Sequence, residues 1–236
     1  MRAIWIVAAS ALLAACNEAT DVPDRVEAAA GGEVDTREEL ELATAAAAGA
    51  ELREDQDVTT LPGGRYVDED GHAYIAFSYS HQGFSNPILR FNGDAFEAVM
   101  DLVPGEPTQS TLMVDLDPSM IDSGVGVFDD HLRSADFFDV ANHPEASFTS
   151  TSLSMDSPTT GTLLGDLTLK GVTKPVALDV TLNKVGEHFR SGTPMFGISA
   201  QGRIKRSDWD LGLYAPNVGD EVTLDIQVEF QKADEG

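Results

Sequence analysis

The side chains that could do chemistry gather in one segment, Asp129 to Ser152, which reads DDHLRSADFFDVANHPEASFTSTS. It places His131 and His143 among four aspartates, and such side chains serve both metal sites and acid–base catalysis. The two histidines lie twelve residues apart, however, and none of the five histidines belongs to an HExxH pattern. The sequence therefore predicts no metal site and no cofactor.

Signatures of covalent catalysis or phosphate binding are also missing from the sequence. It contains no GxSxG nucleophile elbow, and no glycine-rich phosphate loop opens a predicted helix. We therefore predict that the chain is not an enzyme.

Its 40 acidic and 15 basic residues give a formal charge of −25, which excludes a nucleic-acid-binding surface because that needs clustered Lys and Arg.

The N-terminus, MRAIWIVAASALLAACNEAT, predicts export. Arg2 precedes an apolar run too short to span a bilayer, which is typical of a signal peptide. Leu13 to Cys16 resemble a bacterial lipobox, so residues 1–15 are interpreted as a lipoprotein signal peptide and Cys16 as the lipidated residue. We expect a periplasmic protein that is lipid-anchored to the envelope, and Asn17 favours the outer membrane over the inner. The alternative is an ordinary signal peptide that happens to contain a cysteine.

The next segment, residues 16–60, is acidic and alanine-rich, and we expect it to be a disordered or transiently helical spacer. Thr36 and Glu39 form a capping-box pattern, and Gly49 is a stop signal, so a transient helix fits its middle. The alternative is that the spacer docks a partner.

The remaining residues, 61–236, are predicted to form one β domain. Apolar and polar residues alternate with period two in EVTLDIQVEF and VALDVTLNK, which predicts strands with one dry face. Further strands are expected, and the full set covers residues 72–80, 88–103, 110–117, 145–153, 160–170, 176–184, 195–205 and 221–230. Eight antiparallel strands can close into a barrel, with a sandwich as the alternative.

One segment interrupts this pattern. Around residues 129–140, Leu132, Ala135 and Phe138 recur at helical spacing, Asp129 or Asp130 can cap the start, and Pro144 ends the segment. A short helix is therefore expected to close one end of the barrel, with Phe137 and Phe138 plugging that end.

Four colinear segments carry a family resemblance: GRYVDEDGHAYIAFSYSHQGFS, HLRSADFFDVANHPEASFTST, GDLTLKGVTKPVALDV and GDEVTLDIQVEF. In order, they resemble the motifs of the YceI-like family of bacterial polyisoprenoid-binding proteins, over about residues 64–231. The resemblance implies an all-β, eight-stranded antiparallel lipocalin-like β-barrel with an apolar channel for an isoprenoid chain. It also implies a periplasmic location, a homodimer in many members, and no catalysis. Asp210 and the loop from Pro104 to Pro107 depart from the family pattern.

The candidate ligand-binding residues are the apolar residues expected to face inward, together with residues at the strand turn near His81. From the pattern alone, a solid core is as good an interpretation as a cavity; the resemblance favours the cavity. The candidates are Ile75, Phe77, Tyr79, His81, Phe84, Leu112, Val114, Phe137, Phe138, Phe148, Leu167, Leu169, Leu178, Val180, Ile198, Leu224 and Ile226.

Arg90 and Arg133 are the cationic candidates for an anionic head group, because a guanidinium forks onto phosphate; the alternative is a surface ion pair for each. The leading hypothesis is a periplasmic protein that holds a polyisoprenoid, either a quinone tail or a prenyl phosphate, or a similar amphiphile. Two alternatives stay open: a lipid-modifying enzyme in the same channel with His81 or His131 as base, and an envelope interaction module without a ligand.

Overall fold

The computed structural model describes residues 56–234. The predicted signal peptide (1–15), Cys16 and most of the predicted spacer lie outside the described residues. The last five spacer residues do not: Val58 packs against the core, and the Gln56 side-chain oxygen accepts a hydrogen bond from the Val185 N–H at 2.7 Å. Residues 56–60 therefore contact the β domain.

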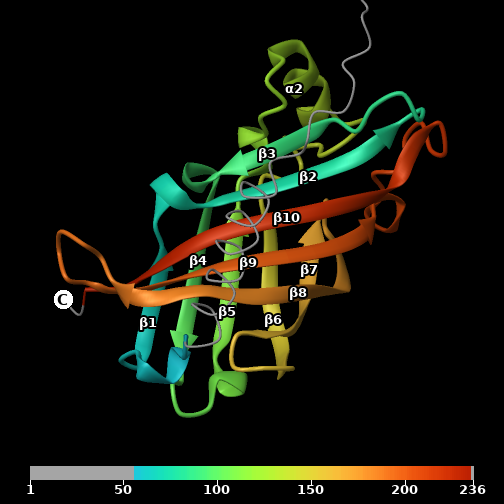
Figure 1. Ribbon diagram of the computed structural model, residues 1–236. Coiled ribbons are helices and arrows are strands. Elements are labelled where there is room, and N and C mark those ends of the chain that lie inside the picture. Colours follow the sequence, from blue (N-terminus) through green and yellow to red (C-terminus); the bar gives the residue numbers. More distant parts are fainter. Residues whose placement is uncertain (1–55, 235–236) are drawn as a thin grey trace, which may run out of the picture. The chain divides into compact units, whose positions relative to one another are not determined.

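Ten strand segments form one antiparallel sheet (Figure 1). Most neighbours in the sheet are also neighbours in the chain. The segments are β1 (Gly64–Asp68), β2 (Tyr74–His81), β3 (Ile88–Asn92), β4 (Phe96–Leu102), β5 (Thr111–Leu116), β6 (Ala146–Met155), β7 (Thr160–Leu169), β8 (Val172–Glu187), β9 (Pro194–Lys205) and β10 (Val218–Lys232).

The sheet closes on itself through β10. This strand pairs with β9 along one edge and with both β2 and β1 along the other, while β2 pairs with β3 and β1 with β4. Segments β1 and β2 thus form one long interrupted strand, and β3 and β4 form another. Counted this way the barrel has eight strands, which confirms the predicted eight-stranded antiparallel fold.

The two interruptions lie against each other, and the sequence did not predict them. Residues 88–103 were expected as one strand, but a 3₁₀ turn at Gly93–Ala95 divides it, and the turn at Asp70–His72 separates β1 from β2. A Cβ atom at Gly93 would lie 2.2 Å from the Asp70 carbonyl oxygen. The two turns can therefore approach this closely only with glycine at position 93.

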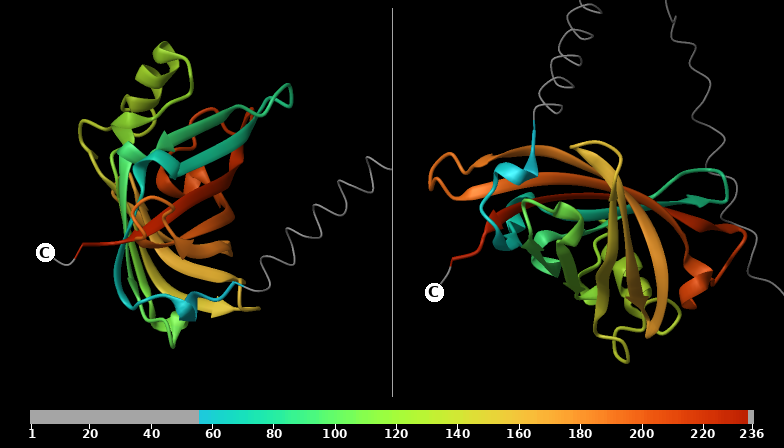
Figure 2. Two further views of the ribbon diagram at one scale, coloured as in Figure 1. Left: turned by 60° about the vertical axis from the view of Figure 1, so that its left-hand side comes forward. Right: turned by 90° about the horizontal axis from the view of Figure 1, so that it is seen from below.

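A single α-helix is found among residues 56–234, α2 (Gly126–Arg133), and it lies at one end of the barrel (Figure 2). It begins earlier than expected, and Asp129 does not cap it: the Asp129 carboxylate accepts hydrogen bonds from the Ser123 N–H at 2.8 Å and the Ser123 hydroxyl at 2.5 Å. The predicted helical spacing to Phe138 is also wrong, because the chain leaves the helix after Arg133 and Asp139 takes a positive φ of 50°.

Period-two alternation sets which side chains face the interior. On β10, Val222, Val228 and Phe230 are buried, whereas Glu221, Thr223 and Asp225 are exposed. Within the described part of the chain, no helix is both long and apolar enough to cross a membrane.

Candidate ligand-binding cavity

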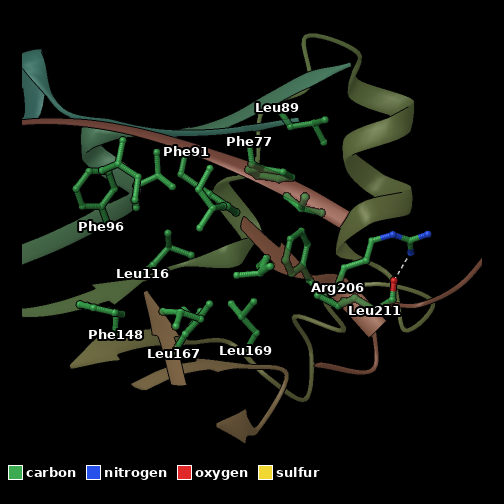
Figure 3. A pocket seen from close by; sticks show the side chains of 18 of the residues that line it. Phe77, Leu89, Phe91, Phe96, Leu116, Phe148, Leu167, Leu169, Arg206 and Leu211 are labelled. Carbon is green, nitrogen blue, oxygen red and sulfur yellow. Dashed lines mark hydrogen bonds between the residues drawn. The ribbon is translucent and has the colours of Figure 1, made fainter. Parts of the chain in front are cut away.

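A cavity of about 610 Å³ lies inside the barrel (Figure 3). Drug-sized ligands typically occupy pockets of roughly 300–1,000 Å³. Phe148, Leu167 and Leu169 face Phe77 and Phe91 across the space, and nearly all of the lining is aliphatic or aromatic. The interior is therefore hollow over this region, although the sequence pattern alone was equally compatible with a solid core.

The residues proposed from sequence as ligand contacts fall mostly on this lining. All of them except Phe84 line the cavity, and their contact with a ligand stays a prediction. The lining members of the predicted set are Ile75, Phe77, Tyr79, His81, Leu112, Val114, Phe137, Phe138, Phe148, Leu167, Leu169, Leu178, Val180, Ile198, Leu224 and Ile226.

Phe84 lies in the predicted strand turn but outside the cavity lining. Its side chain is 87 % exposed and does not line the cavity. Gln82 and Gly83 both adopt positive φ, at 53° and 76°, and the Phe84 N–H donates to the His81 carbonyl at 2.9 Å. This tight turn ends β2 and carries the ring out of the barrel.

Phe148 owes its position to a glycine on the next strand. It lies on β6 where that strand pairs with β7, and a Cβ atom at Gly165 would lie 2.2 Å from the Phe148 Cζ atom. The missing side chain at Gly165 therefore leaves room for the Phe148 ring.

One end of the barrel is solid. Tyr66, Phe196 and Phe230 are almost fully buried, with Phe196 stacked on Phe230 at 5.2 Å and edge-on to Tyr66 at 5.3 Å between ring centroids. The Tyr66 hydroxyl donates to the Pro62 carbonyl at 2.8 Å, so this buried polar group is satisfied. These rings close that end, and Phe230 forms part of the cavity floor.

The other end is open beneath α2. The lining residues that are exposed to solvent all lie there: His81, Ile88, Val125 and Tyr214. Phe137 lies between His131 and Tyr214, with ring centroids 5.0 and 6.4 Å away, so an aromatic cluster partly covers the opening. We call this opening the mouth.

Arg206 is a buried cation at the cavity wall, and sequence reasoning missed it. Its Nε donates to the Gly219 carbonyl at 2.8 Å, Nη1 to the Leu213 carbonyl at 2.9 Å and to the Leu211 carbonyl, and Nη2 to the Val218 carbonyl at 2.8 Å. Figure 3 shows the contact with Leu211. All but one of its N–H donors are thus used by the backbone around the mouth. Desolvation by burial lowers the pKa of Arg206, and the nearby Asp220 carboxylate opposes this shift.

A sequence signal for Arg206 did exist. Phe196, Ile198, Ala200 and Ile204 occupy inward positions of β9, and Arg206 continues the same period-two series. The charge at this inward position was the signal, because a charged side chain on a dry face must find internal partners.

The two arginines predicted as head-group contacts, Arg90 and Arg133, do not line the cavity. Arg90 Nε lies 3.3 Å from the Asp122 carboxylate. Arg133 donates to the Ser119 and Ile121 carbonyls at 2.6 and 3.2 Å and to the Asp130 carboxylate at 3.0 Å. Both side chains instead hold the segment that leads into α2, which corrects the prediction for them.

Polar side chains other than Arg206 also lie at the mouth. Within residues 56–234, the side chains of Tyr79, His81 and His131 make no hydrogen bond to protein, although all three line the cavity. Burial raises the pKa of Tyr79, so its hydroxyl stays protonated at neutral pH. These groups can donate to or accept from a polar atom of a bound molecule.

A second cluster lies away from the cavity. Glu69, His72 and Glu229 place one potential ligand atom each within 4.8 Å of one another, a proximity that the sequence spacing did not reveal. His72 Nδ1 lies 2.5 Å from the Glu69 carboxylate, and this contact, followed by the charges of Glu69 and Glu229, raises the pKa of His72. The ion pair joins His72 to Glu69, and Glu229 adds a second negative charge nearby.

A closed antiparallel barrel with an apolar interior and one open end defines a lipocalin-like binding protein by architecture. Residues 66–230 match the model of the YceI-like domain, and the chain belongs to this family. It is 35 % identical to Protein YceI of Escherichia coli O157:H7 over 164 residues, which is 69 % of this chain and 84 % of that protein.

Solved structures with the same fold include the Campylobacter jejuni YceI protein, at 27 % identity and a TM-score of 0.58, covering 64 % of this chain and 88 % of the other. Another is a polyisoprenoid binding domain from Saccharophagus degradans, at 14 % identity and a TM-score of 0.50, covering 73 % of this chain and 100 % of the other.

Proposed function

We propose that this chain is a periplasmic binding protein that holds the apolar chain of an isoprenoid lipid, such as a quinone tail or prenyl phosphate, in the barrel cavity. The observation that carries the proposal is the cavity itself: about 610 Å³, almost wholly apolar, and open at one end. Each isoprene unit contributes about 3 kcal/mol on burial before ordering costs, so a few units suffice for tight binding.

The two ends of the cavity suit the two ends of such a molecule. The apolar tail lies toward Phe230 and the stacked rings of the closed end. The polar head lies at the mouth, where Tyr79, His81 and His131 offer hydrogen-bonding groups. Membership of the YceI-like family supports a binding role.

Binding rather than catalysis is the activity that we assign. Within the described residues, neither His81 nor His131 is hydrogen-bonded to a hydroxyl or carboxylate that it could activate or that could orient it. The polar groups at the mouth therefore suit recognition of a head group.

Organic extraction of the purified protein followed by mass spectrometry tests the proposal. We expect an isoprenoid lipid in the extract, and saturable uptake of a prenyl lipid by the extracted protein. Leu224→Trp fills the cavity from β10 and should abolish uptake, whereas Leu164→Trp, on an exposed position of β7, should not. An empty extract with no uptake, or equal uptake by both variants, would refute it.

A further inference from the structure

In the described part of the chain, exposed apolar side chains cluster around the cavity mouth. Among residues 56–234, six large apolar side chains are more than half exposed, and five of these are 55–87 % exposed and flank the mouth. We call these five the rim: Phe84, Ile88, Val125, Val127 and Tyr214. The sixth, Phe189, lies at the opposite end in the β8–β9 turn, beneath the Arg190 guanidinium at 5.0 Å.

The rim residues come from three segments that backbone hydrogen bonds bring together. The β3 residue Arg90 exchanges two backbone hydrogen bonds of 3.0 Å with Asp122, shortly before Val125 and α2. The Gln82 N–H donates to the Asn217 carbonyl at 3.1 Å, which joins the β2–β3 turn to the loop that carries Tyr214. The rim is thus built into the fold around one opening.

The exposed rim is continuous with the inside of the barrel. Ile88, Val125 and Tyr214 are exposed to solvent and also line the cavity. A long apolar molecule that enters or leaves must pass these side chains, and in water it would be exposed at that step. Single exposed apolar residues are common, but a cluster at a cavity opening marks an interaction surface.

The charges near the rim indicate what kind of surface fits it. Arg90 is paired with Asp122 at 3.3 Å, and Arg133 with Asp130 at 3.0 Å, so these basic side chains are neutralised locally. The whole chain carries a formal charge of −25. An anionic lipid surface would be repelled, whereas an uncharged or zwitterionic surface is not repelled and can contact the apolar rim.

We propose that the rim docks onto the boundary between head groups and acyl chains of a zwitterionic lipid bilayer, with the cavity mouth facing the bilayer. A lipid then moves between bilayer and cavity without crossing water. This docking goes beyond lipid storage in the barrel, and it does not depend on which lipid the cavity accepts.

A fluorescent probe on the rim tests the proposal. Cys16 is the sole cysteine, so Cys16→Ser with Phe84→Cys gives full-length protein with one thiol, which is labelled with an environment-sensitive dye. Adding phosphatidylcholine vesicles should shift the emission to the blue. The matched control, Phe189→Cys in the same background, is equally exposed at the opposite end and should show no shift. Residues 1–55 are common to both proteins, so adhesion through them alone would not shift the Phe84→Cys probe selectively.

An unlabelled variant supplies the second measurement. Phe84→Ser with Val127→Ser should lower vesicle binding of the Cys16→Ser protein by about tenfold, since two exposed apolar side chains no longer insert. Both positions are exposed, so folding should be unaffected. Mixing phosphatidylglycerol into the vesicles should weaken binding.

Several outcomes would overturn the proposal. One is equal probe responses at positions 84 and 189, and another is no response at either. A shift that needs no vesicles and grows with protein concentration would assign the rim to a second copy of the chain. Binding strengthened by phosphatidylglycerol would contradict apolar docking. None of these outcomes bears on lipid extraction from the cavity, so the two proposals can fail independently.

Discussion

Gly165→Ala is the substitution whose effect the structure defines most sharply. The added Cβ would lie 2.2 Å from Cζ and 2.4 Å from Cε2 of Phe148, and 2.7 Å from the Thr149 carbonyl oxygen. All three distances are below any normal carbon contact. Either the Phe148 ring moves into the cavity or β6 and β7 separate.

The expected cost follows from the geometry. Overpacking of this kind destabilises by about 1–3 kcal/mol, and we expect about 2 kcal/mol for Gly165→Ala. Phe148→Leu alone should cost about 1 kcal/mol, because the ring borders an existing cavity. Leucine lacks the two clashing ring atoms, so Gly165→Ala in the Phe148→Leu protein should cost only about 1 kcal/mol. This residual cost comes from the clash with the Thr149 carbonyl oxygen.

Urea denaturation of the four proteins in the double-mutant cycle measures this coupling of about 1 kcal/mol. Delipidated protein is needed, because a ligand that binds the folded state adds to the apparent stability. Gly105→Ala is the matched control, since no atom lies within 4 Å of its added Cβ. Additive effects, within about 0.5 kcal/mol, would refute the assigned packing of Phe148 over Gly165.

Three further predictions concern buried charge and the N-terminus. Burial raises the pKa of Asp68 above its usual 3.8, and one of its carboxylate oxygens has no hydrogen-bond partner, so the contribution of Asp68 to stability is lost as pH rises from about 4 through the folded pKa. Asp68→Asn should remove this dependence of the unfolding free energy on pH and stabilise the protein at pH 7 by about 1 kcal/mol in denaturation experiments. An unchanged pH dependence would contradict this. Arg206→Lys should lower the free energy of unfolding by about 3 kcal/mol, because an ammonium cannot reach the four carbonyls around the mouth. A loss below about 1 kcal/mol would contradict a stabilising role for these four hydrogen bonds. Cys16→Ser should abolish incorporation of labelled fatty acid in cells, and labelling that persists would remove the lipoprotein interpretation.

Much of the barrel was predictable because its strands have one dry face. Val222, Val228 and Phe230 alternate with polar residues on β10, so the pattern fixed both the strand and its inner face. The crossing of the two turns was not predictable, because the contact between Gly93 and Asp70 joins residues far apart in sequence. Gly93 looked like an ordinary strand residue.

The charged and turn residues show where sequence reasoning fails. Arg90 and Arg133 were chosen for their chemistry, but their positions depend on Asp122 and Asp130, whose proximity only the fold creates. Arg206 was passed over although its place in the alternation of β9 pointed inward. Phe84 was chosen for its place at the strand turn, but the positive φ at Gln82 and Gly83 decided the direction of its side chain.

The three-way pairing of β10 has a consequence for how the barrel forms. When β1 with β2 and β3 with β4 are each counted as one strand, every other pairing joins strands that follow one another along the chain, so they can pair as local hairpins. The last pairing requires β10 to meet β1 and β2, which come from the start of the domain. Closing this long loop has the largest entropic cost of any strand pairing in the barrel. A newly made chain therefore remains an open sheet until its final strand becomes available for pairing. Until then it presents both bare edges and the future cavity lining to chaperones and proteases.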